Sequence, residues 1–192
     1  MSILTFARRA ALGTVASLAF ASVAFAQSTI LVVDQNRIIR ESSVGKHIAK
    51  QMESIGKTME SELKAKATPI QSDRDRLMNE LKNMDATALK SRPDLQKRAQ
   101  DLQVKGQKAQ VEAAYLQQEM KITEAKAMKQ VNEKVAKILE AVVAERNADV
   151  ILDRSLVIYG GKSTDVTDTV ISRLNSQLRT VSVVRERLPR KQ

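Results

Sequence analysis

The sequence predicts an α+β fold that is mostly helical, in which a small β-sheet association body carries a long antiparallel α-helical coiled-coil hairpin arm. Two observations predict it. Continuously apolar, β-branched runs lie near both ends of the chain, at Ile30–Val33 and Val150–Leu152, and such runs are typical of strands buried on both faces. Between them, apolar or small residues recur at steps of three or four, which is the periodicity of packed helices.

The N-terminal segment has the pattern of an export signal. Two arginines precede an apolar stretch that ends in Ala24-Phe25-Ala26, which fits a signal-peptidase site. An uncleaved membrane anchor is the alternative, but the run is short for a span and no stop-transfer pattern follows. We therefore expect residues 1–26 to be a signal peptide, cleaved between Ala26 and Gln27, and the protein to be exported.

The composition after cleavage is unusual for a globular domain. All three phenylalanines lie in residues 1–26, the chain has no tryptophan or cysteine, and Tyr115 and Tyr159 are then the only aromatic residues. Loss of Arg8 and Arg9 reduces the formal net charge from +10 to +8. An ordinary single core built on aromatic side chains is therefore not expected, and disulfides cannot stabilise the chain.

The same composition argues against several function classes. With one histidine and no cysteine, triad and zinc chemistries lose most of their parts, so we expect no enzymatic activity and no cofactor. Nucleic-acid binding would suit the positive charge, but export and the lack of stacking aromatic residues argue against it. The single histidine, His47, is interpreted as an ordinary helix-surface residue.

The chain divides into three expected parts. Residues 27–44 and 148–178 should form the β-rich body, residues 45–147 the hairpin arm, and residues 179–192 a basic C-terminal tail. The tail is expected to be mobile, although Val181–Val184 could form an edge strand.

The arm should reverse near residues 91–94. Ser91 and Asp94 have the spacing of a capping box, and Pro93 is acceptable only in a first helical turn. From Leu95 to Met120 the apolar or small positions alternate steps of four and three without error. At a rise of 1.5 Å per residue, helices of about forty residues give an arm of roughly 60 Å. Pro69 predicts a kink in the first helix, and an alanine-rich seam predicts a compliant arm.

The body should be an oligomer interface. A third strand is expected at Leu156–Tyr159, and Thr164 or Asp165 should cap a final helix. Because the strands are apolar on both faces, association with copies of the same chain is the simplest cover, but these residues do not set the copy number. The residues expected in this association body are Ile30, Leu31, Val32, Val33, Val150, Ile151, Leu152, Val157, Ile158 and Tyr159.

Two sets of arm residues are candidates for contact with a bound partner. Met78 and Met128 fall off the helical seam, and methionine recurs on promiscuous binding surfaces; simple surface exposure is the alternative. The expected arm tip is rich in cations, which would attract acidic partners or anionic lipid headgroups unless they are an ordinary solvated surface. These cations are Lys82, Lys90, Arg92, Lys97 and Arg98.

The order of the segments carries a family resemblance. The strand Ile30–Asp34 leads into the charged hairpin, and the chain returns as Asp149–Asp153, Val157–Tyr159 and Asp165–Asp168 with a final helix. Over residues 28–178 this pattern resembles the Skp/OmpH family of periplasmic chaperones for outer-membrane proteins. The extension after Leu178 departs from the family pattern.

The resemblance implies a homotrimer whose three hairpins enclose a cavity. It implies ATP-independent holding of unfolded outer-membrane proteins, which would keep them soluble for delivery to the outer membrane. Anionic lipid or lipopolysaccharide is a further candidate partner. A structural coiled-coil scaffold or adaptor of the envelope, without chaperone activity, fits the heptads equally well.

Overall fold

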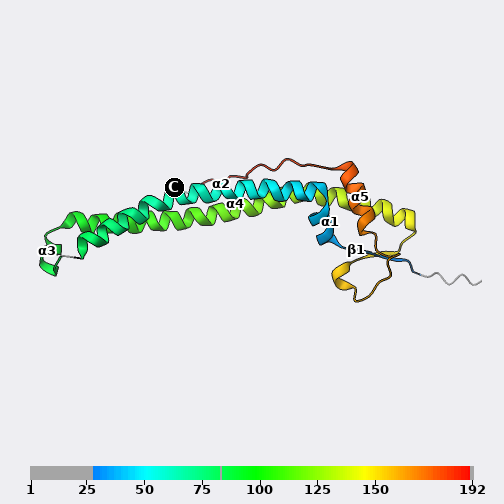
Figure 1. Ribbon diagram of the computed structural model, residues 1–192, viewed down its shortest axis with the longest axis horizontal. Helices are drawn as coiled ribbons and strands as arrows, with labels where there is room; N and C mark the ends of the chain where they lie inside the picture. Colours follow the sequence, from blue (N-terminus) through cyan, green and yellow to red (C-terminus); the bar gives the residue numbers. More distant parts are fainter. Residues whose placement is uncertain (1–27, 83, 191–192) are drawn as a thin grey trace, which may run out of the picture.

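The computed structural model describes residues 28–82 and 84–190 and shows a long two-helix arm attached to a small body (Figure 1). The predicted cleavage site at Ala26 and Gln27 lies outside the described residues. The elements in chain order are β1 (Ile30–Val33), α1 (Gln35–Glu41), α2 (Ser43–Leu81), α3 (Ala86–Lys90), α4 (Pro93–Arg146), β2 (Val150–Asp153), a 3-10 turn (Arg154–Leu156) and α5 (Thr167–Gln177).

The two predicted terminal strands meet in one sheet. β1 and β2 are parallel, with Ile30 opposite Val150 and Val33 opposite Asp153. The pairing is extended at its edge by the Thr29 amide, which donates to Asp149 Oδ2 at 2.8 Å. A parallel pair needs a long crossover connection, and here the whole arm provides it. The predicted α+β, mostly helical fold is confirmed.

The third strand expected at Leu156–Tyr159 is wrong. Asp153 accepts a hydrogen bond from the Ser155 amide at 2.9 Å and caps a 3-10 turn, after which Ile158 is fully exposed. Instead, β1 has a single parallel bridge from Val32 to Asp165 on its other edge. The Val32 amide donates to the Thr164 carbonyl at 2.8 Å, and the Val166 amide donates to the Val32 carbonyl at 2.9 Å.

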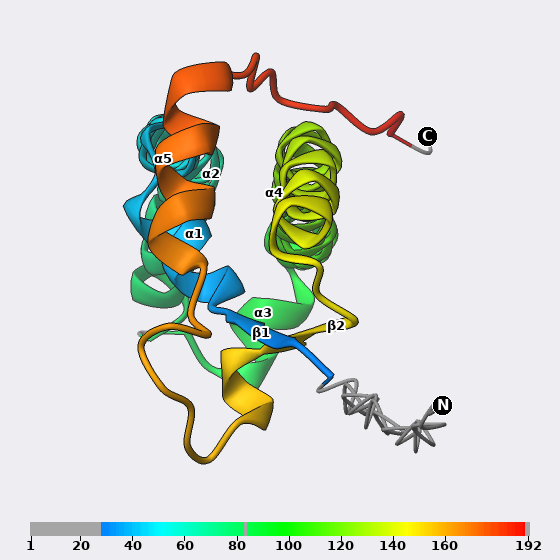
Figure 2. The same ribbon diagram turned by 90° about the vertical axis from the view of Figure 1, so that its right-hand side faces the viewer.

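The body core lies where the arm base meets α1 and α5. Its apolar side chains come from both ends of the chain and from the base of both long helices. The largest that are almost fully buried are Val33, Ile38, Val44, Val131, Val142, Val166, Val170 and Leu174. In Figure 2, α5 lies on the same side as α1 and α2, and it packs against α1, α2 and the end of α4.

The short helices of the body are capped locally. The Asp34 side chain accepts from the Arg37 amide at 2.8 Å and starts α1. Neither predicted side-chain cap closes α5: its N-cap is Val166, which makes no side-chain cap bond, although Asp165 accepts from the Thr167 amide nearby. Asn147, in the left-handed conformation with φ 47°, ends α4.

The two arm helices run antiparallel, side by side in both views (Figures 1 and 2). Three cross-helix ion pairs step in opposite directions along the two helices, as an antiparallel register requires: Glu80–Arg98, Asp73–Lys105 and Lys66–Glu112. The predicted seam lies on the facing sides, but of its α4 repeat only Leu95 and Leu116 are fully buried. Alanine is too short to fill the space between the helices.

The reversal is built differently from the prediction. α2 ends at Leu81 and the short helix α3 intervenes before α4, so the connection is longer than the expected four-residue turn. The Ser91–Asp94 capping box is wrong, because Arg92 holds the N-cap position without a side-chain cap and Asp94 pairs with Arg92 at 2.7 Å. Pro93 does occupy the first turn of α4. Pro69 lies inside α2, and the helix continues on both sides of it.

The junction between α1 and α2 depends on a glycine. Ser42 ends α1 and caps α2 by accepting the Gly45 amide at 3.1 Å. A Cβ atom at Gly45 would lie 1.7 Å from the Ile39 carbonyl oxygen, which is backbone and cannot move aside alone. Only glycine permits this close approach.

We predict that Gly45→Ala lowers the free energy of unfolding by at least about 1–3 kcal/mol, because the added methyl group overlaps the backbone of α1. Gly106→Ala is the matched control. Nothing lies within 4 Å of a Cβ there, so it should raise the free energy of unfolding by about 0.5–1 kcal/mol. Urea unfolding followed by circular dichroism measures both, and equal effects would contradict the assignment.

Candidate functional site

The predicted contact cations gather near the arm tip, but two of them are engaged. Arg92 is paired with Asp94, and Arg98 donates to Glu80 across the hairpin at 2.8 Å. The other three, Lys82, Lys90 and Lys97, are exposed and make no ion pair within the part of the chain that the structure describes. The tip therefore presents a small group of solvated lysines on α3, the start of α4 and the end of α2.

The two predicted methionines are far apart in the fold. Met78 is 55% exposed, one turn before the end of α2 at the arm tip. Met128 is half-buried and packs against the body core at the other end of the arm. The structure does not bring them into one surface, and Met78 is the more accessible of the two.

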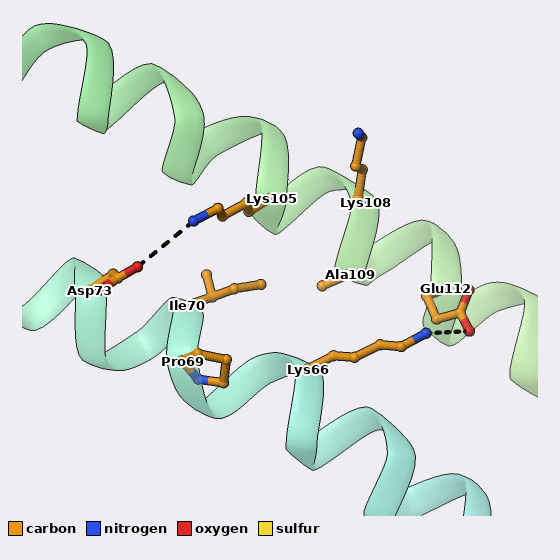
Figure 3. Close-up of a pocket in the computed structure, with 8 residues that line it drawn as sticks. All are labelled: Lys66, Pro69, Ile70, Asp73, Lys105, Lys108, Ala109 and Glu112. Atoms are coloured by element: carbon orange, nitrogen blue, oxygen red, sulfur yellow. Dashed lines mark hydrogen bonds and ion pairs between the residues drawn. The ribbon is translucent and has the colours of Figure 1, made fainter. Parts of the chain in front are cut away.

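Open grooves follow the seam between α2 and α4. One groove of about 400 Å³ is floored by Ile70 and Ala109, which face each other across the gap (Figure 3). Lys66 and Lys105 reach across it to Glu112 and Asp73, so the groove has an apolar floor and charged rims. The Lys108 amine points away from α2.

A second groove of about 430 Å³ lies nearer the body. It is lined mainly by apolar or small side chains, with a few polar ones at its edges: Met59, Glu60, Leu63, Ala113, Leu116, Gln117, Met120 and Lys121. Both grooves sit where the seam contains alanine. The arm thus offers shallow apolar surface along its length rather than one closed cavity.

The body leaves an apolar edge uncovered. Ile30 and Val150 face each other at the start of the sheet and are each about 45% exposed. Beyond the sheet, Leu156, Ile158 and Tyr159 are 75%, 104% and 88% exposed. The remaining strand residues of the predicted trimer body, Leu31, Val32, Val33, Ile151 and Leu152, are buried or half-buried in the single chain, and Val157 is half-buried.

The C-terminal residues correct the expectation of a mobile tail. Residues 179–190, here called the C-terminal strap, have no regular secondary structure and form no edge strand at Val181–Val184. They leave α5, cross the seam between α2 and α4 and end beside α4, midway along the arm (Figures 1 and 2). Val181 is 7% exposed and joins the body core, and the carbonyl of Val181 accepts from His47 Nε2 at 3.1 Å.

The strap is fastened by two arginines. Arg185 donates to both oxygens of Glu62 on α2, at 2.9 and 2.8 Å, and to Glu119 Oε2 on α4 at 2.8 Å. Arg190 holds Glu112 with two hydrogen bonds of 2.8 and 3.1 Å and also donates to Glu119. Paired guanidinium–carboxylate contacts of this kind are strong and directional. Arg185 therefore links the two arm helices to each other.

Further contacts fix the path of the strap. The guanidinium carbon of Arg190 lies 4.6 Å from the centroid of the Tyr115 ring, which is cation–π distance. The Glu186 and Leu188 amides donate to Thr123 Oγ1 and Glu119 Oε1, at 3.0 and 2.9 Å. The Glu119 side chain is completely covered as a result.

Two carboxylates under the strap, those of Glu112 and Glu119, are held in their charged form. Hydrogen bonds from Arg190 and then Lys66 lower the pKa of Glu112 from its ordinary value of 4.5 to about 2. Burial acts to raise the pKa of Glu119, but hydrogen bonds from Arg190, the Leu188 amide and Arg185 outweigh it and lower the pKa. We call Glu62, Glu112 and Glu119 the acidic face of the arm.

Sequence reasoning missed the acidic face because each residue looks like an ordinary surface charge on a helix. The one available signal was composition: the tail is rich in arginine, and Glu112 and Glu119 lie seven residues apart on one side of α4. Neither fact identifies the partner, since the paired residues are separated by 66 or more positions in the chain.

The architecture defines an α+β protein in which a coiled-coil hairpin extends from a small sheet. Residues 29–174 match the family of outer membrane proteins described as OmpH-like, and the chain belongs to that family. The family match ends before the C-terminal strap begins.

Two relatives illustrate the likeness. The chaperone protein Skp of Pectobacterium atrosepticum is 22% identical over 151 residues, which cover 78% of this chain and 90% of that protein. A solved structure of an OmpH-like protein from Caulobacter crescentus has 25% sequence identity and a TM-score of 0.69, covering 85% of this chain and 93% of that one.

Within residues 28–82 and 84–190, no helix has the length and apolar character needed to cross a membrane.

We predict that the strap leaves the arm as the pH falls from about 4.5 toward 2. The folded-state pKa of Glu112 lies below its ordinary value. Its contribution to holding the strap on the arm is therefore complete above about pH 4.5 and is lost as the carboxylate takes up a proton. A fluorophore on Val184→Cys, at a position 67% exposed, reports release as a fall in anisotropy.

The control for this titration carries the same fluorophore on Met78→Cys, at a position 55% exposed on α2 near the arm tip. Its anisotropy should stay constant until the helices themselves unfold. Simultaneous transitions at both positions would mean that the strap is not released separately from the arm.

Proposed function

We propose that the protein is an ATP-independent holdase of the periplasm, which binds unfolded outer-membrane proteins between helical arms and keeps them soluble. Family membership and the chaperone name of the Pectobacterium relative support this proposal. The observation that carries it from the structure is the pair of open, apolar-floored grooves along the arm. Unfolded outer-membrane strands alternate apolar and polar residues, and such chains need many weak apolar contacts rather than one tight site.

The charge of the arm supports the same proposal. The tip lysines, together with Lys108 and Lys121 at the groove rims, make no ion pair among the described residues and would draw in acidic segments and anionic lipid or lipopolysaccharide headgroups. This attraction acts over about 8–10 Å at physiological ionic strength, so it should weaken as salt is added. The apolar contacts in the grooves would then hold the captured segment.

The uncovered apolar edge of the body supports assembly into a homotrimer. Leu156, Ile158 and Tyr159 form an exposed apolar group beside the sheet in the single chain. Large exposed apolar groups are unusual on a monomer and are typical of surfaces that associate. Three arms fixed at one such body would enclose the space in which a client is held.

We expect the mature chain to keep a urea-denatured porin soluble after dilution, without nucleotide, at a severalfold excess of trimer over porin. Light scattering at the dilution step measures the effect. A structural coiled-coil scaffold would leave porin aggregation unchanged, so that result would contradict the holdase and favour the scaffold.

Ile158→Asp should shift the mature chain from trimer to monomer, because it would place a charge in an apolar contact between subunits. Val111→Asp is the matched control, since Val111 is 54% exposed on α4 of the arm, away from the body. Multi-angle light scattering gives the mass of each. A trimeric Ile158→Asp protein would remove this residue from the interface.

A further inference from the structure

The acidic face depends on the C-terminal strap for its counter-charges. Both ion-pair partners of Glu62, Arg185 and Arg187, come from the strap. Both ion-pair partners of Glu119, Arg185 and Arg190, also come from it. Of the ion pairs that the acidic face makes among the described residues, only Lys66–Glu112 would remain without the strap. On a chain with a formal net charge of +10, this is a local site for cations.

The bound segment shows which kind of ligand the site accepts. The strap is extended, and alternate residues Val181, Val183 and Arg185 turn toward the protein while Ser182 and Val184 are exposed. Side chains of an extended chain alternate in this way. The site therefore receives one edge of an extended polypeptide.

Two of the contacts involve only the main chain of the strap. The Glu186 and Leu188 amides, two residues apart on the same edge, donate to Thr123 and Glu119 of α4. Any non-proline residue can supply such amides. Selectivity then comes from Arg185 and Arg190, whose guanidinium groups pair with the acidic face. The Arg190 guanidinium also lies over the Tyr115 ring.

We propose that the acidic face and its neighbours Tyr115 and Thr123 form a binding site for extended, arginine-bearing polypeptide segments, which the C-terminal strap fills when no such ligand is bound. The proposal rests on the holdase function, because the ligand it names is an extended segment of an unfolded client. The strap thus competes with the client for this part of the arm.

The arrangement suits a reversible competitor. The strap has no strand or helix of its own and lies beyond the family match, which ends at residue 174. A segment tethered by a short link has an effective concentration on the order of millimolar. A client segment displaces the strap only if it binds the site more favourably than the tethered strap does. Segments that bind weakly or carry few arginines would be excluded, while long unfolded chains with several arginines would displace the strap.

The test uses the full mature chain with Arg185→Gln and Arg190→Gln together, which vacates the acidic face but keeps Val181 in the body core. A labelled synthetic peptide with the sequence of residues 179–190 is titrated against it and against the unchanged chain. The variant should bind the peptide at least about tenfold more tightly, because the tethered competitor is gone. Adding Glu119→Gln to the variant should abolish this gain.

The matched control replaces two arginines outside the acidic face, Arg179→Gln and Arg146→Gln. Among the described residues, Arg179 donates only to the Asn175 carbonyl, and Arg146 is exposed in the last turn of α4. The charge change is the same, and peptide binding should match that of the unchanged chain. Equal peptide affinity for all three proteins would overturn the proposal.

A second measurement uses the unchanged chain. Hydrogen exchange at the Glu186 and Leu188 amides should speed up when an unfolded outer-membrane protein is held in solution, because the client displaces the strap. Unchanged exchange with a soluble client would overturn the inference and leave the holdase intact. Aggregation of the client would instead contradict the holdase, while the peptide titration would still decide whether the site exists.

Discussion

The parallel pairing of β1 with β2 is the constraint on which the rest of the structure depends. It joins residues on either side of the whole arm, and it fixes Ile30 opposite Val150 in a definite register. The bridge from Val32 to Asp165 then places α5 over the arm base, where Val170 and Leu174 are fully buried. Without this closure the two long helices would have no common anchor, because their own seam is too thin to hold them in place.

That thin seam also gives the arm its surface. Alanine along α4 leaves the helices in contact but not interlocked, and the grooves at Ile70–Ala109 and Leu63–Ala113 follow. A leucine-filled seam would be more stable and would present no such apolar floor. Stability between α2 and α4 is supplied in part by polar groups instead, through cross-helix ion pairs and through Arg185, which contacts both helices at once.

The sequence predicted the features that depend on local pattern. The apolar runs at Ile30–Val33 and Val150–Leu152 and the regular steps from Leu95 to Met120 have one sensible interpretation each, and the structure contains the corresponding strands and helix, although Ile30 and Val150 are exposed. The run Leu156–Tyr159 misled because β-branched, apolar residues serve equally in a strand and at an uncovered edge. Ser91 and Asp94 misled because α3 already uses Ser91 as its C-cap.

The C-terminal strap shows where pattern reasoning ends. A basic, proline-containing segment at a terminus is usually solvated. Nothing in that segment reveals that it contacts Glu62 and Glu119, which are distant in the sequence. Such pairs arise only because the closed body places α5 beside the arm, so that the strap that follows α5 lies along the arm. Long-range electrostatic partners of this kind follow from the fold and not from the residues nearby.

The claim that grooves along the arm hold unfolded chains is tested most directly by photo-crosslinking to a bound, unfolded outer-membrane protein. A photoreactive residue replaces Ala113, which lines a groove, or Ala125, which is exposed on α4 and lines neither of the two seam grooves. The account predicts abundant client adducts from position 113 and few from position 125. Equal yields, or adducts from position 125 alone, would contradict it.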